Sequence, residues 1–115
     1  MRTCHNVKLT YLYRDAANYK ARGQVTFSNC EGLSLAEIER SLTACLIDGM
    51  FFIASQVSIP EVFLFYKYPF SEDDHLFHEF DSVEYTREQV TDFEGRSVKR
   101  FIEQCTLAQK YNWQY

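Results

Sequence analysis

Glycine and proline are scarce in this sequence, and it has no long apolar run. Four Gly and two Pro among 115 residues leave no Gly-rich or Pro-rich linker, so we expect a single domain over residues 1–115. No stretch reaches the roughly 18 apolar residues of a membrane-spanning helix, and the first residues lack the apolar core of a secretion signal. The sequence thus predicts a globular domain with no membrane contact.

Paired cysteines are also absent. The four Cys stand at positions 4, 30, 45 and 105, and these long, irregular spacings argue against a disulfide framework and a zinc ribbon. Cys45 and Cys105 fall on predicted apolar helix faces, where Cys acts as a small hydrophobic residue. We therefore expect reduced thiols and a cytoplasmic protein.

Basic residues are fewer than acidic residues, and the charge is unevenly distributed along the sequence. The net charge is −4, and residues 69–115 hold five Lys and Arg against ten Asp and Glu. This excludes the basic footprint of a nucleic-acid-binding protein. The acidic half is instead suited to a basic partner surface.

Catalytic signatures are missing as well. The sequence has no Gly-x-Ser-x-Gly elbow, no P-loop and no dinucleotide-binding fingerprint. A thiolate mechanism has little support, because adjacent Cys4 and His5 on an extended segment point apart. We predict no cofactor, and we expect a binding protein more than an enzyme.

Aromatic residues, in contrast, are abundant, with eight Tyr and ten Phe. They provide volume for a core, and exposed Tyr suits recognition because its two ends differ in polarity. Small domains of this kind also bury residual apolar surface in symmetric dimers. Self-association as a homodimer is therefore part of the expectation.

Hydrophobic periodicity predicts two helices and several strands. The helix at Ser34–Asp48 begins with a capping box of Ser34 and Glu37 and is followed by Gly49 in the position after the C-cap. A second helix is predicted at Ser97–Lys110. The predicted strands are Val7–Arg14, Gln24–Ser28, Met50–Ser58, Glu61–Tyr68 and Leu76–Thr86.

Two of these strands have an alternative. Met50–Ser58 could continue the preceding helix, and Leu76–Thr86 shifts register, which indicates a bulge near Asp81–Ser82 or two short strands. The order strand-strand-helix-strand-strand-strand-helix favours an α+β fold. We expect an antiparallel sheet of about four to five strands with both helices on one face.

The segment Ser71–Asp81 has the densest group of potential ligand side chains. A metal ion needs His nitrogens about 2 Å from one centre, but a strand points His75 and His78 to opposite faces. A metal-dependent hydrolase site of Asp74, His75 and His78, with Glu79, is therefore the third hypothesis. His78 alone is expected on the apolar side, either in the core or lining a pocket.

Acidic side chains extend beyond that segment. Nine acids and one base, Arg87, lie between positions 72 and 94. A charged run is usually a solvated turn, but its most economical function is contact with a basic protein. The candidate contact residues are Glu72, Asp73, Asp74, Glu79 and Asp81.

One cationic cluster stands out, at Arg14–Lys20. Arg can hold a carboxylate or phosphate with two hydrogen bonds, and Tyr can stack on a base. The alternative is a surface turn in which Asp15 and Asn18 bond to the backbone. The candidate residues for a small anionic ligand such as a nucleotide are Arg14, Asp15, Asn18, Tyr19 and Lys20, with His78.

Five further runs are distinctive: Leu9–Lys20, the turn Phe27–Asn29, the helix start Leu33–Glu39, Leu46–Gly49 and Asp74–Phe80. Together they resemble a small family of uncharacterised bacterial and phage-associated proteins. The resemblance implies a bacterial, cytoplasmic setting and carries no known activity. Our first hypothesis is therefore a non-enzymatic intracellular interaction module, our second a binder of a small anion.

Overall fold

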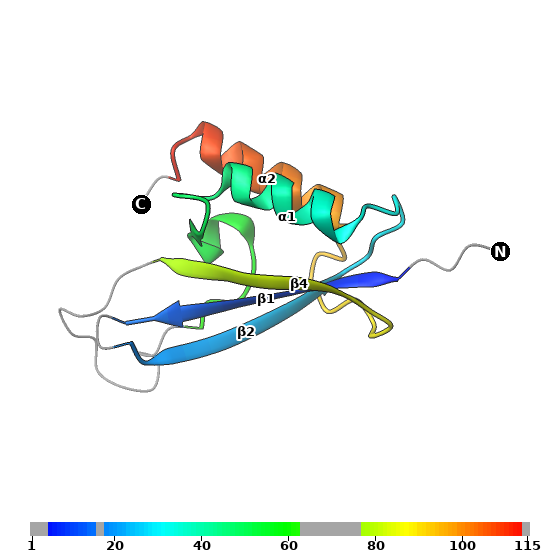
Figure 1. The fold of residues 1–115 in the computed structure, drawn as a ribbon, viewed down its shortest axis with the longest axis horizontal. Coiled ribbons are helices and arrows are strands. Elements are labelled where there is room, and N and C mark those ends of the chain that lie inside the picture. Colours follow the sequence, from blue (N-terminus) through cyan, green and yellow to red (C-terminus); the bar gives the residue numbers. More distant parts are fainter. Residues whose placement is uncertain (1–4, 16–17, 63–76, 114–115) are drawn as a thin grey trace.

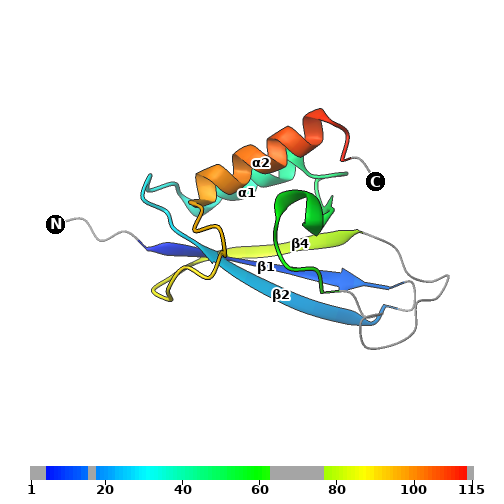
Figure 2. The ribbon, with the colours of Figure 1, turned by 180° about the vertical axis from the view of Figure 1, so that it is seen from behind.

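The computed structural model describes residues 5–15, 18–62 and 77–113. Four antiparallel strands form one curled sheet, and both helices pack on the same side of it, as Figures 1 and 2 show. This confirms the predicted α+β fold. The elements are β1 (Asn6–Arg14), β2 (Lys20–Phe27), α1 (Leu35–Cys45), β3 (Phe51–Phe52), the 3₁₀ helix η1 (Ala54–Val57), β4 (His78–Thr86) and α2 (Val98–Lys110).

The sheet order is β2-β1-β4-β3, so β1 lies in the middle and pairs along its length with β2 and β4. Leu9 lies opposite Val25 on one side and Val83 on the other, which gathers apolar side chains on the helix face. β3 is short and pairs only with His78 and Glu79. Within the described part of the chain, no strand lies beside the outer edge of β4 from Ser82 to Thr86.

A bulge interrupts the pairing of β1 with β4. Thr10 lies opposite Ser82 and Tyr11 lies opposite Phe80, so Asp81 is the extra residue. The predicted bulge near Asp81–Ser82 is confirmed, and the segment is one strand and not two. The extra residue shifts the alternation of side chains between the two sheet faces by one position. Val83 and Tyr85 therefore face the helices, as Phe80 does.

The start of α1 is as predicted, and its end is not. Ser34 Oγ accepts from the Glu37 amide at 3.1 Å, and the Glu37 carboxylate accepts from the Ser34 amide at 3.1 Å. The helix ends at Cys45 and not at Asp48, and extended Leu46 is its C-cap. Gly49, with φ +71°, lies in the next turn, because Ile47 bonds with Phe51 to lead the chain into β3.

The strand predicted at Met50–Ser58 is also corrected. It shrinks to β3, and η1 follows it. Ile53, Ala54 and Val57 are all buried, which a helical turn achieves for closely spaced residues and a strand does not. β2 begins at Lys20 and not at Gln24, because pairing with β1 outweighs the polar composition there. Most of the strand predicted at Glu61–Tyr68 lies outside the described residues.

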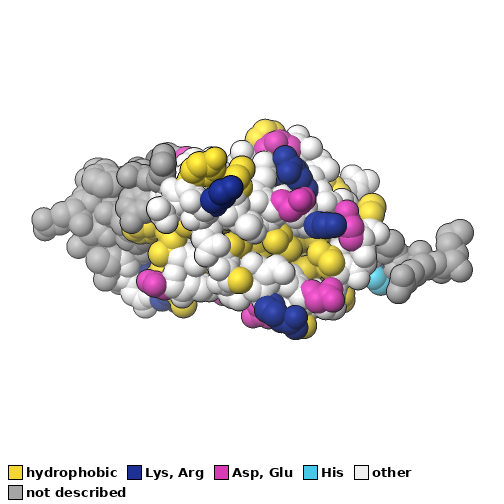
Figure 3. All heavy atoms as spheres, turned by 90° about the horizontal axis from the view of Figure 1, so that it is seen from above, with side chains coloured by type: hydrophobic (Ala, Val, Ile, Leu, Met, Phe, Trp, Pro, Cys, Tyr) yellow, Lys and Arg dark blue, Asp and Glu magenta, His cyan; other side chains and the backbone are white. Residues whose placement is uncertain are grey.

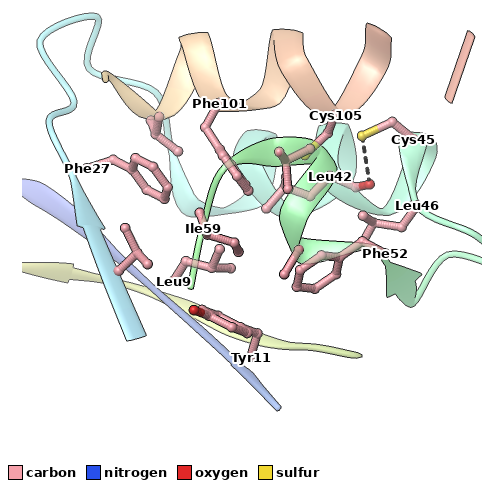
Figure 4. Close-up of a cluster of buried hydrophobic side chains, with 14 of the residues drawn as sticks. Leu9, Tyr11, Phe27, Leu42, Cys45, Leu46, Phe52, Ile59, Phe101 and Cys105 are labelled. Atoms are coloured by element: carbon pink, nitrogen blue, oxygen red, sulfur yellow. Dashed lines mark hydrogen bonds between the residues drawn. The ribbon is translucent and has the colours of Figure 1, made fainter. Parts of the chain in front are cut away.

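One hydrophobic cluster fills the space between the sheet and the helices (Figure 4). Phe27 of β2 stacks on Phe101 of α2, with the ring centroids 4.6 Å apart. Cys45 and Cys105 are buried in it as thiols, as predicted, and Cys45 Sγ donates to the Leu42 carbonyl at 3.2 Å. Among the described helices, none combines the length and apolarity that crossing a bilayer requires.

Candidate functional site

Acidic side chains of β4 meet basic side chains of β1 and β2 on the sheet face away from the helices. Arg14 Nε lies 3.1 Å from Glu79 Oε1, and Arg22 Nη1 lies 3.6 Å from Asp81 Oδ2. Lys8 Nζ lies 4.0 Å from Glu84 Oε1 and also contacts Glu88. The antiparallel order thus brings the acidic C-terminal half beside the basic strands of the N-terminal half.

Arg14 and Glu79 are the most closely joined of these pairs. Arg14 Nε and Nη2 donate to the two carboxylate oxygens of Glu79 at 3.1 and 3.3 Å, and Nη1 donates to Asn18 Oδ1. This is the two-bond geometry that was expected for an external anion. The structure therefore pairs a predicted ligand-binding residue with a predicted partner-binding residue.

The remaining polar groups described between Asp15 and Tyr19 bond with one another. Asp15 Oδ1 accepts from the Tyr19 amide at 2.9 Å, and the Asp15 amide donates to the Tyr19 carbonyl at 3.0 Å. Asn18 adopts φ 69°, a left-handed conformation that Asn tolerates well. This is the geometry of a surface turn, on which the side chain of Tyr19 is exposed, as is that of Lys20.

His78 lies in the core and is fully buried. Its Nε2 accepts from the Val62 amide at 3.1 Å, so the ring hydrogen of the neutral imidazole is on Nδ1. The rings of Tyr11, Tyr13 and Phe52 surround it, with centroids 5.9 to 6.1 Å away. His78 is thus on the helix side, whereas Arg14 bonds to Glu79 on the opposite face, so the described residues place the two on different faces of the sheet.

Tyr11, next to His78, is a buried polar group with a defined partner. Its hydroxyl donates to the Pro60 carbonyl at 2.7 Å, and burial raises the pKa of the phenol to about 12. The ring also lies across Gly23 of β2, where an added Cβ would come within 2.9 Å of it. Tyr11 is therefore neutral at physiological pH and holds the segment after η1 against the sheet.

The hypothetical metal site falls largely outside the described residues, which exclude Asp74 and His75, and also Glu72 and Asp73. In the described ranges, no three His, Cys, Asp or Glu side chains come together in a way that could hold a metal ion. His78 itself is enclosed by aromatic rings. A site that includes Asp74 and His75 remains a prediction.

A buried ion pair, Asp92 with Arg96, is the main feature that the sequence analysis missed. Arg96 bonds both oxygens of Asp92 at 2.7 and 2.9 Å and donates to the carbonyls of Val57 and Ser58 at 2.7 and 2.9 Å. Burial opposes ionisation of Asp92, but the hydrogen bonds and charge of Arg96 outweigh it and lower the pKa of the carboxyl. Because both residues lie outside regular helices and strands, no periodicity distinguishes them from a surface pair.

The outer edge of β4 combines exposed acids with apolar side chains. The side chains of Asp81 and Glu84 are 41% and 61% exposed. Between and beside them, Val83 is half-buried and Tyr85 is 46% exposed. Glu84 was not among the predicted contact residues, although its position between Val83 and Tyr85 in an alternating strand indicates a solvent-facing acid.

A second exposed feature lies where α2 meets η1. A groove of about 450 Å³ is lined by Gln56, Gln104, Leu107, Ala108 and Tyr111. Leu107 and Tyr111 are 53% and 58% exposed. Figure 3, which looks onto the helix side, shows hydrophobic side chains interspersed with both signs of charge, so no single-sign field extends over this face.

Comparison with models of protein families, with curated proteins and with solved structures finds no match. The comparisons therefore supply neither a family nor an activity, and they add no support to the bacterial and phage-associated resemblance. The candidate site rests on the geometry of β4 and its neighbours.

Proposed function

We propose that this protein is a non-enzymatic interaction module that contacts a basic protein partner through the acidic strand β4. The observation that carries the proposal is the exposure of Asp81 and Glu84 on β4, whose outer edge from Ser82 to Thr86 has no strand beside it among the described residues. The bases described beside them lie 3.6 and 4.0 Å away. Exposed pairs of this kind contribute only about 0–1 kcal/mol, so Lys or Arg of a partner can compete with them.

Glu79 has a different part in this proposal from Asp81 and Glu84. Its side chain is only 15% exposed, and both of its oxygens accept from Arg14. It therefore supports the strand, and Glu84 replaces it in the contact surface. Glu72, Asp73 and Asp74 remain predicted contributors, as does the cytoplasmic setting, which rests on the cysteine spacing.

The alternatives receive less support. Binding of a small anion by Arg14 would require its guanidinium to leave Glu79 and Asn18. A hydrolytic metal site would need ligands that include the fully enclosed His78. Self-association is a form of the same interaction function, with a second copy as the partner.

The proposal is tested by neutralising the acids without adding a charge clash. Asp81→Asn/Glu84→Gln changes the net charge from −4 to −2, and so does the control Glu39→Gln/Glu103→Gln on exposed positions of α1 and α2. The probe is a labelled Lys-rich peptide, measured by fluorescence anisotropy. We expect binding to the β4 variant to weaken about tenfold, or about 1.4 kcal/mol, while the control binds nearly as the wild type does.

Equal weakening in both variants would mean that net charge alone attracts the peptide, and the proposal would then be wrong. Circular dichroism of each variant checks that the fold is unchanged. Asp81 and Glu84 are exposed, so their neutralisation is expected to leave stability within about 0.5 kcal/mol.

A further inference from the structure

We propose that the partner binds by strand addition: an extended segment with alternating basic and apolar side chains pairs with the outer edge of β4 from Ser82 to Thr86. This inference rests on the proposed function and specifies its partner. Within the described residues, β3 covers the edge only at His78 and Glu79, and the Phe80 amide donates to the Met50 carbonyl at 2.9 Å. Beyond that point the outer backbone groups of β4 have no described strand beside them.

The two edges of the sheet differ in how far other described segments cover their backbone groups. The C-terminal end of β2 is covered, because the Thr26 carbonyl accepts from the amides of Thr91 and Asp92 at 3.0 and 3.2 Å. The Thr26 amide donates to Thr91 Oγ1 at 2.8 Å. An exposed strand edge is a template for pairing, and proteins commonly cover it in this way. The edge of β4 from Ser82 to Thr86 has no such cover among the described segments.

Side-chain alternation along this edge specifies the incoming strand. Ser82, Glu84 and Thr86 lie opposite residues of β1 on the face away from the helices, with Asp81 reaching Arg22 on the same face. Val83 and Tyr85 lie on the helix face, and Tyr85 is steadied by a bond from its hydroxyl to the Leu33 carbonyl at 3.3 Å. A strand with Lys or Arg opposite the acids has apolar side chains opposite Val83 and Tyr85.

The same features select against other occupants. The exposed carboxylates of Asp81 and Glu84 disfavour an acidic strand at this edge, because like charges opposite each other destabilise strand pairs. A second copy is disfavoured as well: an antiparallel pair of β4 strands that matches Val83 with Tyr85 places Glu84 against Glu84 of the other copy. Like charges directly opposite each other destabilise strand pairs.

Three synthetic peptides of about seven residues, a common strand length, provide the test. One alternates Lys and Val, one has the same composition in a Lys block and a Val block, and one is the alternating peptide with N-methyl groups on every second amide. All three peptides carry the same charge, so electrostatic attraction alone would give them equal affinity. Binding is measured by calorimetry, and amide hydrogen exchange of β4 is followed by NMR.

We expect the alternating peptide to bind at least about tenfold more tightly than the block peptide, since strand pairing adds several hydrogen bonds. The outward-facing amides among Ser82–Thr86 should become protected with the alternating peptide. The N-methylated peptide, with its methyl groups on the amides of the pairing side, should not give this protection. Equal binding of all peptides without protection would overturn strand addition but leave electrostatic contact through Asp81 and Glu84 intact. A dimer in light scattering, with the outward-facing amides of Ser82–Thr86 already protected without peptide, would overturn it in favour of a second copy.

Discussion

Arg96 joins three separate parts of the chain. It contacts Asp92, the end of η1 and Gln104 of α2, and its guanidinium lies 5.4 Å from the centre of the Phe101 ring. The side chains of Arg96 and Asp92 are 4% and 1% exposed. A buried ion pair adds little net stability compared with an apolar replacement of both members, but removing one member leaves a buried charge.

We therefore predict that Arg96→Met destabilises the protein by about 3–5 kcal/mol, measured by urea unfolding. Arg100→Met, on the exposed side of α2, is the matched control and should change the unfolding free energy by less than about 0.5 kcal/mol. A loss below about 1 kcal/mol in Arg96→Met would contradict the role assigned to the pair.

The pH dependence of this variant separates charge from packing. Folding lowers the pKa of Asp92 below its ordinary value of 3.8, so the carboxylate stabilises the fold above that pH. This contribution is lost as the pH falls through the lowered pKa. The difference in unfolding free energy between wild type and Arg96→Met should accordingly narrow below about pH 4. A difference independent of pH would point to lost packing alone.

At the scale of elements, both helix starts and the end of α2 at Lys110 were predicted correctly, whereas the end of α1 was not. The capping box of Ser34 and Glu37 involves residues three apart, so its bonds form within the segment. The end of α1 depends on where the chain must turn toward β3, and that depends on β4, far away in sequence. The shortened β3 and the early start of β2 have the same cause, since strand pairing outweighs local preference.

The capping box gives a prediction at this scale. Ser34→Ala removes the acceptor for the Glu37 amide and should lower the unfolding free energy by about 0.5–2 kcal/mol. Ser41→Ala, in the middle of α1 and exposed, is the control and should be neutral or slightly stabilising, because Ala has the higher helix propensity. Urea unfolding followed by circular dichroism measures both. If Ser34→Ala were as stable as Ser41→Ala, the cap would contribute nothing to the fold.

At the scale of the whole molecule, the C-terminal residues close the core. Trp113 is 3% exposed, its indole N–H donates to the Cys45 carbonyl at 3.0 Å, and its amide donates to the Ala108 carbonyl at 2.8 Å. It thereby joins the end of α2 to the end of α1. The side chain belongs to the same hydrophobic cluster as side chains of β1 and η1. Its removal should therefore lower the stability of the whole domain.

We predict that Trp113→Ala lowers the unfolding free energy by about 3–5 kcal/mol, whereas Tyr111→Ala, with its side chain 58% exposed, lowers it by less than about 1 kcal/mol. In the wild type, fluorescence of this single Trp and circular dichroism should report one coincident transition, as expected of one domain. Two separate transitions would show that the end of α2 unfolds independently of the sheet.

The candidate site was predicted only in part, for reasons of geometry. Alternation correctly indicated that His78 faces the apolar side and that a bulge lies near Asp81, because both depend on local periodicity. It left open whether His78 lies in the core or lines a pocket, and it did not reveal that Arg14 bonds Glu79. Those features depend on which strands become neighbours.

The sequence by itself determined the α+β class, the helix starts, the apolar faces and the register shift in β4, because each is marked by the spacing of apolar, polar and capping residues close along the chain. Only the tertiary structure decided that β4 lies beside β1, with no strand of the described part of the chain along its outer edge from Ser82 to Thr86. That order places all three acids of β4 against bases of β1 and β2, and it leaves Asp81 and Glu84 more exposed than Glu79. Coulomb attraction and strand pairing act between residues that are neighbours in space. The periodicity of the sequence does not show which strands become neighbours.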